Sequence, residues 1–337
     1  MAACDHGYGF GTQSGFGAGG GMNDAPVLSV VMPAYCEGDQ IRENFEIVHG
    51  IVARLGVAFE IVVIDDGSID ETAQILDSMT DEFPELVFAS LARNFGKEGA
   101  ISAGLDLARG KAVVVMDCDM QHPPDLIPEM FQLWRESDVK VVNAVKQDRG
   151  VETAVTSIGS RLFYSIFDRL TSTKLSGSSD FKLLDREVVD AYRLLPERNT
   201  FFRGLIAWFG YSQANVYFDV PGRTSGESKW SSFSLIRTAV QVIVSFSAKP
   251  LHLVTIIGVF FLIFAGLVMV QTIYRKLGGG AVEGFTTVII LILFSSSILM
   301  ISLGIIGQYI AQIYDEMKRR PRYLIDRHHR SKFQERD

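Results

Sequence analysis

Two aspartates separated by one residue follow an uncharged, β-branched run and form the strongest chemical signal in the chain. Asp117 and Asp119 come directly after the run 112–116, and Gln121 and two prolines follow them. Prolines end the hydrogen-bond ladder of a strand, and ligands collect at the carboxyl ends of strands in open α/β sheets. Carboxylate oxygens beside an amide suit Mg²⁺ or Mn²⁺, which can neutralise a diphosphate leaving group. The alternative for this pair is a solvated loop without a ligand.

A second acid pair, Asp65 and Asp66, ends the apolar run 61–64. Acids at the end of a strand can accept hydrogen bonds from a base N–H or from ribose hydroxyls. The alternative is an N-cap and turn, in which Ser68 or Asp70 starts the next helix.

A tyrosine and several cations complete the candidate set. The first apolar run ends at 33–37, where the ring of Tyr35 can face a base. The cations are Arg93, Lys97, Lys146, Arg161, Arg223 and Lys229. Each of them alone is typical of a solvated surface charge. The run 223–229 differs, because a Gly/Ser loop carrying Arg and Lys near a membrane suits a lipid phosphate or diphosphate.

Short β-branched runs alternate with amphipathic stretches and predict the elements that position these residues. The runs are 27–32, 60–64, 86–91, 112–116 and 140–145. With helices between them, they predict an α/β fold with a mostly parallel sheet, in which the acid pairs meet at one edge. The Gly-rich stretch 1–24 cannot bury enough surface to offset its chain entropy, so we expect a disordered tail.

Two stretches without a charged residue follow the α/β pattern, within 251–274 and 284–314. Each is long enough to cross a hydrocarbon core of about 30 Å. Buried helices of a soluble core are the alternative, but soluble helices of this length normally carry a polar face. The sequence therefore predicts two transmembrane helices, at about 251–274 and 285–313.

Charges and amphipathicity around these spans predict how the chain meets the membrane. The basic tail 315–337 places both termini in the cytoplasm by the positive-inside rule. Arg275 and Lys276 in the connecting loop favour the opposite orientation but are outnumbered. Apolar residues recur at helical spacing in 230–249, which predicts an interfacial amphipathic helix, with ordinary packing against the soluble domain as the alternative.

Composition limits the class of protein. The chain has 337 residues, 47% of them hydrophobic, which fits one soluble domain plus a membrane portion. Its formal net charge of -7 argues against a nucleic-acid partner. Cys4, Cys36 and Cys118 form no CxxC pair, as is typical of a reducing compartment. The N-terminus lacks the pattern of a signal peptide, so we expect the first folded domain to stay in the cytoplasm.

The motifs together resemble a known family. The matching segments are 30–37, 64–72, 93–98, 117–124, 180–186, 223–229, 307–309 and 320–323. They are similar to the family-2 inverting glycosyltransferases of GT-A (Rossmann-like) fold, and within these to the polyprenyl-phosphate branch with dolichol-phosphate mannose synthases and GtrB-type glucosyltransferases. Cys36 stands where asparagine is usual, and Ser179 replaces a common glycine.

The resemblance implies roles for individual residues. It implies that the metal, Mg²⁺ or Mn²⁺, is held by Asp117, Asp119 and Gln121. The nucleotide-sugar set is Pro33, Ala34, Tyr35, Glu37, Asp65, Asp66, Lys97, Asp117 and Cys118, with Asp66 as the expected base contact. The phosphate and acceptor set is Lys146, Arg161, Arg223 and Lys229. Asp119 and Asp180 are the expected catalytic residues, and Asp180 can orient the acceptor, take its last proton, or merely cap a helix or accept a hydrogen bond in the core.

The resemblance also implies an activity and a domain plan. A sugar, with UDP-glucose as the expected donor, passes with inversion to undecaprenyl or dolichyl phosphate at the cell membrane. A catalytic domain at 25–229 precedes the interfacial helix 230–249, two spans within 250–314 and the cytoplasmic tail 315–337. Glycines in the second span, Gly304 and Gly307, can support a homo-oligomer.

Two rival functions remain at this stage. A processive polysaccharide synthase needs more material for a channel than two spans, and the Gln-X-X-Arg-Trp motif of that group is absent from the sequence. A non-catalytic membrane subunit with the same fold is disfavoured by the intact acids Asp117 and Asp119.

Overall fold

The computed structural model describes residues 25–146, 178–198, 200–218, 249–277 and 284–330. The soluble part contains β1 (Leu28–Ala34), α1 (Ile41–Ala53), β2 (Phe59–Asp65), α2 (Thr72–Met79), β3 (Leu86–Leu91), α3 (Lys97–Leu107), β4 (Ala112–Val115), α4 (Ile127–Glu136), β5 (Val141–Lys146), β6 (Ser178–Asp185), α6 (Arg186–Arg193), α7 (Phe202–Trp208) and β7 (Gln213–Phe218). Two long helices and one strand follow: α9 (Lys249–Leu277), α10 (Phe285–Met317) and β8 (Ile325–Arg330).

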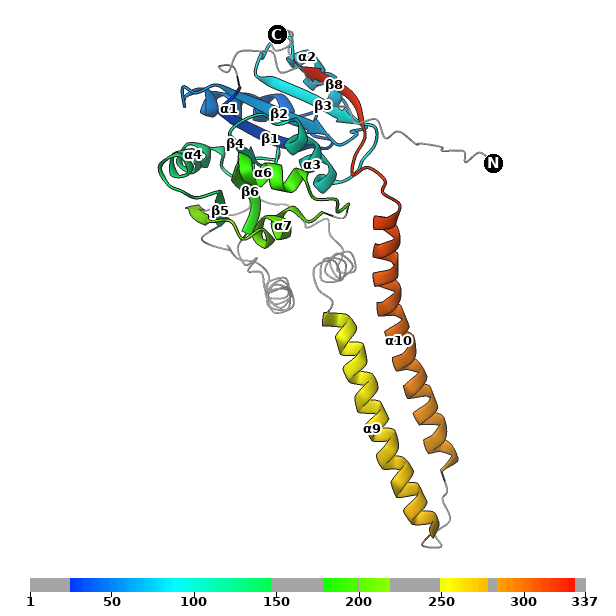
Figure 1. Cartoon of the computed structure of the whole chain (residues 1–337). Helices are drawn as coiled ribbons and strands as arrows, with labels where there is room; N and C mark the ends of the chain where they lie inside the picture. Colours follow the sequence, from blue (N-terminus) through cyan, green and yellow to red (C-terminus); the bar gives the residue numbers. More distant parts are fainter. Residues whose placement is uncertain (1–24, 147–177, 199, 219–248, 278–283, 331–337) are drawn as a thin grey trace, which may run out of the picture.

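The strands form one mixed sheet in the order β7-β5-β6-β4-β1-β2-β3-β8. Its centre is parallel, because β1 pairs with both β4 and β2, and β2 pairs with β3. Strand β6 runs antiparallel between β4 and β5, so its first residues lie at the carboxyl end of β4. The predicted architecture, a mostly parallel α/β sheet followed by two long apolar helices, is confirmed (Figure 1).

Alternating side chains along the strands build two apolar cores, one on each face of the sheet. Val30 and Val63 pack with Phe45 of α1 on one face. Val31 packs with Ile101 of α3 on the other. Full burial of each such side chain contributes roughly 1.5–3 kcal/mol.

Helix α3 lies unusually close to the sheet because Gly104 faces β1. A Cβ at this position would collide with the side chain of Val31. The close approach of α3 fixes its first turn, which begins at Lys97, beside the carboxyl ends of the parallel strands. The packing of one glycine thus helps to place a candidate functional lysine.

Helices α9 and α10 extend away from the α/β domain (Figure 1). The segments Val254–Tyr274 and Leu291–Met317 are long and apolar enough to cross a membrane, and neither is buried in the structure. The two helices contact each other, for example through the rings of Phe261 and Phe294. Gly304 and Gly307 have open space around their Cα atoms, and the homo-oligomer proposed for them stays a prediction.

The chain returns to the sheet after α10. The helix ends where Arg319 adopts a positive φ of 47°, a left-handed conformation common just beyond helix ends. Strand β8 then pairs antiparallel with β3, at the sheet edge (Figure 1). Residues 325–330 of the segment expected as a tail, 315–337, therefore contribute a strand to the α/β domain. The segment 1–24, expected as a disordered tail, lies outside the described residues. The segment 230–249, expected as an interfacial helix, also lies outside them, except for residue 249 at the start of α9.

Candidate active site

The carboxyl ends of β1, β2 and β4 meet at one edge of the sheet, as the sequence predicts. Ala34 at the end of β1 is paired with Asp65 at the end of β2. Val31 of β1 is paired with Val115, the last residue of β4, and Asp117 follows two residues later. This edge therefore gathers the predicted acids from three separate segments of the chain.

Asp65 organises the turn after β2. Its side chain is fully buried and accepts hydrogen bonds from the Ser90 hydroxyl (2.7 Å) and the Ser68 amide (3.0 Å). Gly67 in this turn has a φ of +66°, and a Cβ there would lie 2.5 Å from the backbone of Arg93. The turn and the loop before α3 are consequently packed backbone against backbone.

Asp66 organises that loop. Its carboxylate accepts hydrogen bonds from the amides of Phe95 (2.7 Å) and Gly96 (2.8 Å). Burial raises the pKa of Asp66, although these two amides act against the shift. Both oxygens of Asp66 accept from the backbone of the loop before α3, and its expected contact with a base stays a prediction.

Lys97 connects two acids from different strands. Its Nζ lies 2.5 Å from Oδ1 of Asp117 and 2.5 Å from Oδ2 of Asp180. Asp180 also forms a bidentate pair with Arg203 of α7, with Nε to Oδ1 at 2.5 Å and Nη2 to Oδ2 at 2.7 Å. We call Lys97, Asp117, Asp180 and Arg203 the charge cluster.

The charge cluster fixes the protonation of two of its members, Asp180 and Lys97. Burial would raise the pKa of Asp180, but Arg203 and Lys97 outweigh burial and hold this pKa well below its usual range. Burial would lower the pKa of Lys97, but Asp180 and Asp117 outweigh it and raise this pKa. Lys97 is therefore a cation and Asp180 an anion at neutral pH, which makes Asp180 a poor proton acceptor.

Asp119 lies at the exposed end of the same loop. Its Oδ1 accepts a hydrogen bond from the Gln121 amide (3.1 Å). Burial, and then the carboxylates of Asp119 and Asp70, raise the pKa of Glu37, which follows β1. Cys118 between the two aspartates is buried in the apolar core, and burial raises the pKa of its thiol to about 12. Its side chain is thus part of the core.

The segment after β1 is held against the turn after β2. The Cys36 amide donates to the Ser68 hydroxyl (2.9 Å), and the Glu37 amide donates to the Thr72 hydroxyl (3.0 Å). Pro33 and Ala34 end β1, and Tyr35 beyond them is 43% exposed, which leaves its ring free to meet a ligand.

The acceptor set is only partly described. Lys146 ends β5, is exposed, and lies at the same edge of the sheet as Asp117, because β5 and β4 both run antiparallel to β6. Arg161, Arg223 and Lys229 lie outside the described residues.

Sequence reasoning missed three charged residues of this region. Arg203 is a member of the charge cluster, and Glu98 and Lys182 lie beside it. Lys182 on β6 is buried and donates to Oδ1 of Asn143 (2.5 Å), and burial lowers its pKa to about 7. No local motif marks any of them, because their partners come from strands and helices distant in the sequence.

Glu98 provides a prediction about stability. Its Oε2 accepts a hydrogen bond from the Phe202 amide (2.8 Å), and burial raises its pKa to about 7. A carboxyl whose pKa is raised on folding binds more protons in the folded state, so it lowers stability as pH rises from its unfolded pKa through 7. Glu98→Gln keeps the acceptor and removes the titration. We expect the free energy of unfolding of this variant, minus that of the wild type, to grow by roughly 2.5 kcal/mol from pH 5 to pH 8.

Unfolding curves in detergent at a series of pH values measure this difference. Glu136→Gln, a change at an exposed position of α4, serves as the matched control and should show no such trend. Parallel pH profiles for wild type and Glu98→Gln would contradict the prediction.

These features define a class of protein: an α/β transferase domain with acids at its strand ends, attached to two membrane-length helices. The chain belongs to glycosyl transferase family 2, whose profile matches residues 29–193.

Relatives extend this similarity over most of the chain. An uncharacterized glycosyltransferase from Synechocystis sp. is 39% identical, over 88% of this chain and 94% of the relative. The putative glycosyltransferase CsbB of Bacillus subtilis is 36% identical, over 89% of this chain and 91% of the relative. A prophage-derived bactoprenol glucosyl transferase of Shigella flexneri is 34% identical, over 90% of this chain and 98% of the relative. The similarity includes the two apolar helices as well as the catalytic domain.

Proposed function

We propose that this protein transfers glucose from UDP-glucose to a polyprenyl phosphate, undecaprenyl or dolichyl phosphate, with inversion at the anomeric carbon. The observation that carries the proposal is the charge cluster, which lies at the carboxyl ends of the parallel strands, where ligands bind in open α/β sheets. The same chain continues into two helices long enough to cross a membrane. Similarity to the Shigella flexneri bactoprenol glucosyl transferase over nearly the full length of both chains supports this lipid and this sugar.

The phosphate of the lipid acceptor is an anion, and it suits the two cations of the charge cluster, Lys97 and Arg203. A phosphate monoester carries about -1.5 to -2 charge near neutral pH, so its oxygen needs no strong base before it attacks. The side chains of Lys97 and Arg203 are 39% and 31% exposed, so both can contact an anionic ligand. Asp180 holds these two cations in place and does not take a proton. The catalytic role expected for Asp180 is thus orientation of the acceptor.

The reaction follows from this arrangement. One phosphate oxygen of the lipid attacks the anomeric carbon in line with the departing nucleoside diphosphate. The new bond from carbon to oxygen forms as the bond to the diphosphate breaks, and its electron pair leaves with the diphosphate. Positioning of the two anions and fixed positive charge supply the rate enhancement.

A divalent cation fits the acids after β4 in part. Among the described residues, no group of three His, Cys, Asp or Glu side chains is placed to hold a metal ion. Asp117 and Asp119 with the Gln121 amide oxygen supply hard oxygen donors, and Mg²⁺ commonly binds one or two carboxylates together with substrate phosphates. We assign these three residues to Mg²⁺ or Mn²⁺ together with the donor diphosphate. The bound ion supplies positive charge that stabilises the leaving group.

The donor and acceptor assignment is tested with purified protein in lipid nanodiscs. Undecaprenyl phosphate is supplied with UDP-glucose, UDP-N-acetylglucosamine or GDP-mannose, and the lipid product is identified by its mass. We expect a polyprenyl phosphate hexose from UDP-glucose, and no product without the lipid phosphate. Donor hydrolysis without a lipid-linked sugar, or no reaction with any donor, would overturn the proposal. A product with several added sugars would indicate a processive synthase.

We further propose that both termini face the cytoplasm, in the cell membrane. The pairing of β8 with β3 supports this, because it requires the end of α10 to emerge on the side of the catalytic domain. Basic residues after α10 favour the cytoplasmic side.

Labelling of whole cells with an impermeant maleimide tests this orientation. In a background without Cys4 and Cys36, we expect Asp337→Cys to react only after the cells are broken. The control Gly279→Cys, between the two spans, should react in intact cells. Labelling of Asp337→Cys in intact cells would place the C-terminus outside and contradict the prediction.

A further inference from the structure

The end of helix α10 grips the chain that connects α6 to α7. The backbone amide of Arg198 donates one bifurcated hydrogen bond to the two carboxylate oxygens of Glu316 (3.0 and 3.1 Å). The Arg322 guanidinium donates to the backbone oxygens of Glu197 (2.7 Å) and Leu195. We call residues 195–198 the gripped segment.

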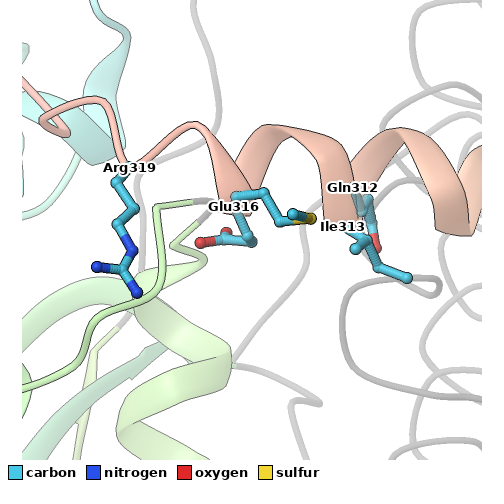
Figure 2. A pocket seen from close by; sticks show the side chains of 5 residues that line it. Gln312, Ile313, Glu316 and Arg319 are labelled. Atoms are coloured by element: carbon cyan, nitrogen blue, oxygen red, sulfur yellow. The ribbon is translucent and has the colours of Figure 1, made fainter.

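Figure 2 shows Glu316 on the side of α10 that faces the catalytic domain, beside Arg319 and a pocket at the end of the helix. The pocket has a volume of about 560 Å³ and is lined by Gln312, Ile313, Glu316, Met317 and Arg319. The Glu316 contact is therefore made at the point where the membrane helix meets the soluble domain.

The gripped segment leads directly into the catalytic side of the domain. Helix α7 begins four residues after Arg198, at Phe202, whose amide is held by Glu98 of α3. The next residue, Arg203, forms the bidentate pair with Asp180. Only four residues thus separate Arg198, which Glu316 contacts, from Arg203, a member of the charge cluster.

The hydrogen bonds from Glu316 and Arg322 hold the backbone of the gripped segment in a defined position. Charged groups hold backbone atoms on both of its sides, and hydrogen bonds to charged groups are stronger and more directional than neutral ones. Arg322 also lies over the ring of Tyr192 on α6, 5.7 Å from its centroid. The neighbouring Tyr323 hydroxyl donates to Asp106 of α3 (2.6 Å), so the segment that follows α10 is itself bonded to α3.

We propose that Glu316 and Arg322 are positioning residues of the transfer reaction, which hold the gripped segment so that Arg203 keeps Asp180 aligned with Lys97. The end of the second membrane helix thereby sets the geometry of the acceptor side of the site. This inference rests on the proposed function, which assigns Lys97, Asp180 and Arg203 of the charge cluster to the lipid phosphate. Arg322 acts through Arg203 and touches neither substrate.

A double-mutant cycle tests whether Arg322 acts through Arg203. Arg322→Gln is expected to lower kcat/KM for the polyprenyl phosphate by about tenfold to a hundredfold, the loss typical of small misplacements of reacting groups. The KM for UDP-glucose should change by less than about twofold. The acids expected to bind this donor follow β1, β2 and β4, and they do not belong to the gripped segment. Arg203→Lys should show a loss of its own. The combined variant should be no slower than Arg203→Lys alone, within about twofold, because coupled residues are non-additive.

Arg320→Gln is the matched control. Arg320 is exposed and belongs to the same basic run, so its replacement removes the same unit of positive charge. We expect it to keep wild-type kinetics. Equal losses in Arg320→Gln and Arg322→Gln, or multiplied losses in the combined variant, would overturn the proposal.

A second measurement does not depend on turnover. Hydrogen exchange of the full-length protein should rise in α7 for Arg322→Gln and for Glu316→Gln, while the strands β1, β2 and β4 keep their protection. Unchanged exchange in α7 would refute the positioning role even if the protein used another acceptor. The kinetic measurement on the wild type tests the proposed function separately. A wild-type protein that makes no lipid-linked sugar would refute that function.

Discussion

Asp119→Asn is expected to lower turnover by about a hundredfold or more, equivalent to about 2.7 kcal/mol of transition-state stabilisation. The substitution keeps the size of the side chain and the oxygen that accepts from the Gln121 amide, so the loop should keep its shape. It removes one of the negative charges with which we expect the protein to hold a divalent cation against the donor diphosphate. Without that charge the leaving group loses its counter-ion, and the barrier rises.

The same preparation tests the ion itself. Chelation with EDTA should stop the wild-type enzyme, and Mg²⁺ or Mn²⁺ should restore it, while Asp119→Asn should regain little at the same concentration. Asp125→Asn, six residues further along and outside the site, is the matched control and should behave as the wild type. Thermal unfolding of all three proteins excludes a general loss of stability. An Asp119→Asn enzyme that turns over normally in chelator would return Asp117 and Asp119 to the solvated-loop alternative.

Patterns that depend on local sequence predicted the framework of the site well. The five runs read as strands each agree with an observed strand within two residues at either end. Central parallel strands are buried on both faces, so their sequences are continuous apolar runs, and polar residues mark the point where burial stops. The acids Asp65 and Asp117 were visible for this reason.

Contacts between distant segments could not be read in the same way. Arg203 stands in the apolar context 201–207, where a lone arginine has the appearance of a surface charge. Its partner Asp180 begins an antiparallel strand whose register is set by pairing with β4 and β5. The link between them depends on tertiary packing, which no spacing of residues encodes.

Strand β8 was hidden by its composition. The stretch 325–330 carries charged residues and histidines, which indicated a solvated tail. Basic residues are also typical of edge strands, where they prevent pairing with other chains. Both structures are compatible with the same local pattern, and only the partner strand β3 decides between them.

Lys97→Gln is expected to lower kcat/KM for the lipid acceptor by about a hundredfold to a thousandfold, the loss typical when a preorganised stabilising group is removed. The Nζ of Lys97 lies 2.5 Å from a carboxylate oxygen of Asp117 and 2.5 Å from one of Asp180. Those two oxygens are therefore within about 5 Å of each other, where two unit charges repel by about 3 kcal/mol at an effective dielectric constant near 20. Without Lys97, no cation offsets this repulsion between the two acids. The substitution also removes a positive charge from the expected path of the lipid phosphate.

Lys97→Arg separates charge from shape, because it keeps the cation and changes its reach and geometry. We expect it to recover part of the lost activity, and more of the lost stability than of the activity, since the repulsion between the acids is again screened. Arg93→Gln is the matched control: Arg93 is exposed, and its guanidinium lies over the Phe95 ring at 4.5 Å in the same loop. Steady-state kinetics with varied lipid phosphate, recorded with thermal unfolding, give the answer. If Lys97→Gln and Arg93→Gln reduce activity equally, the loop contributes general positive charge, and the position of Lys97 between the two acids has no special role in the transfer.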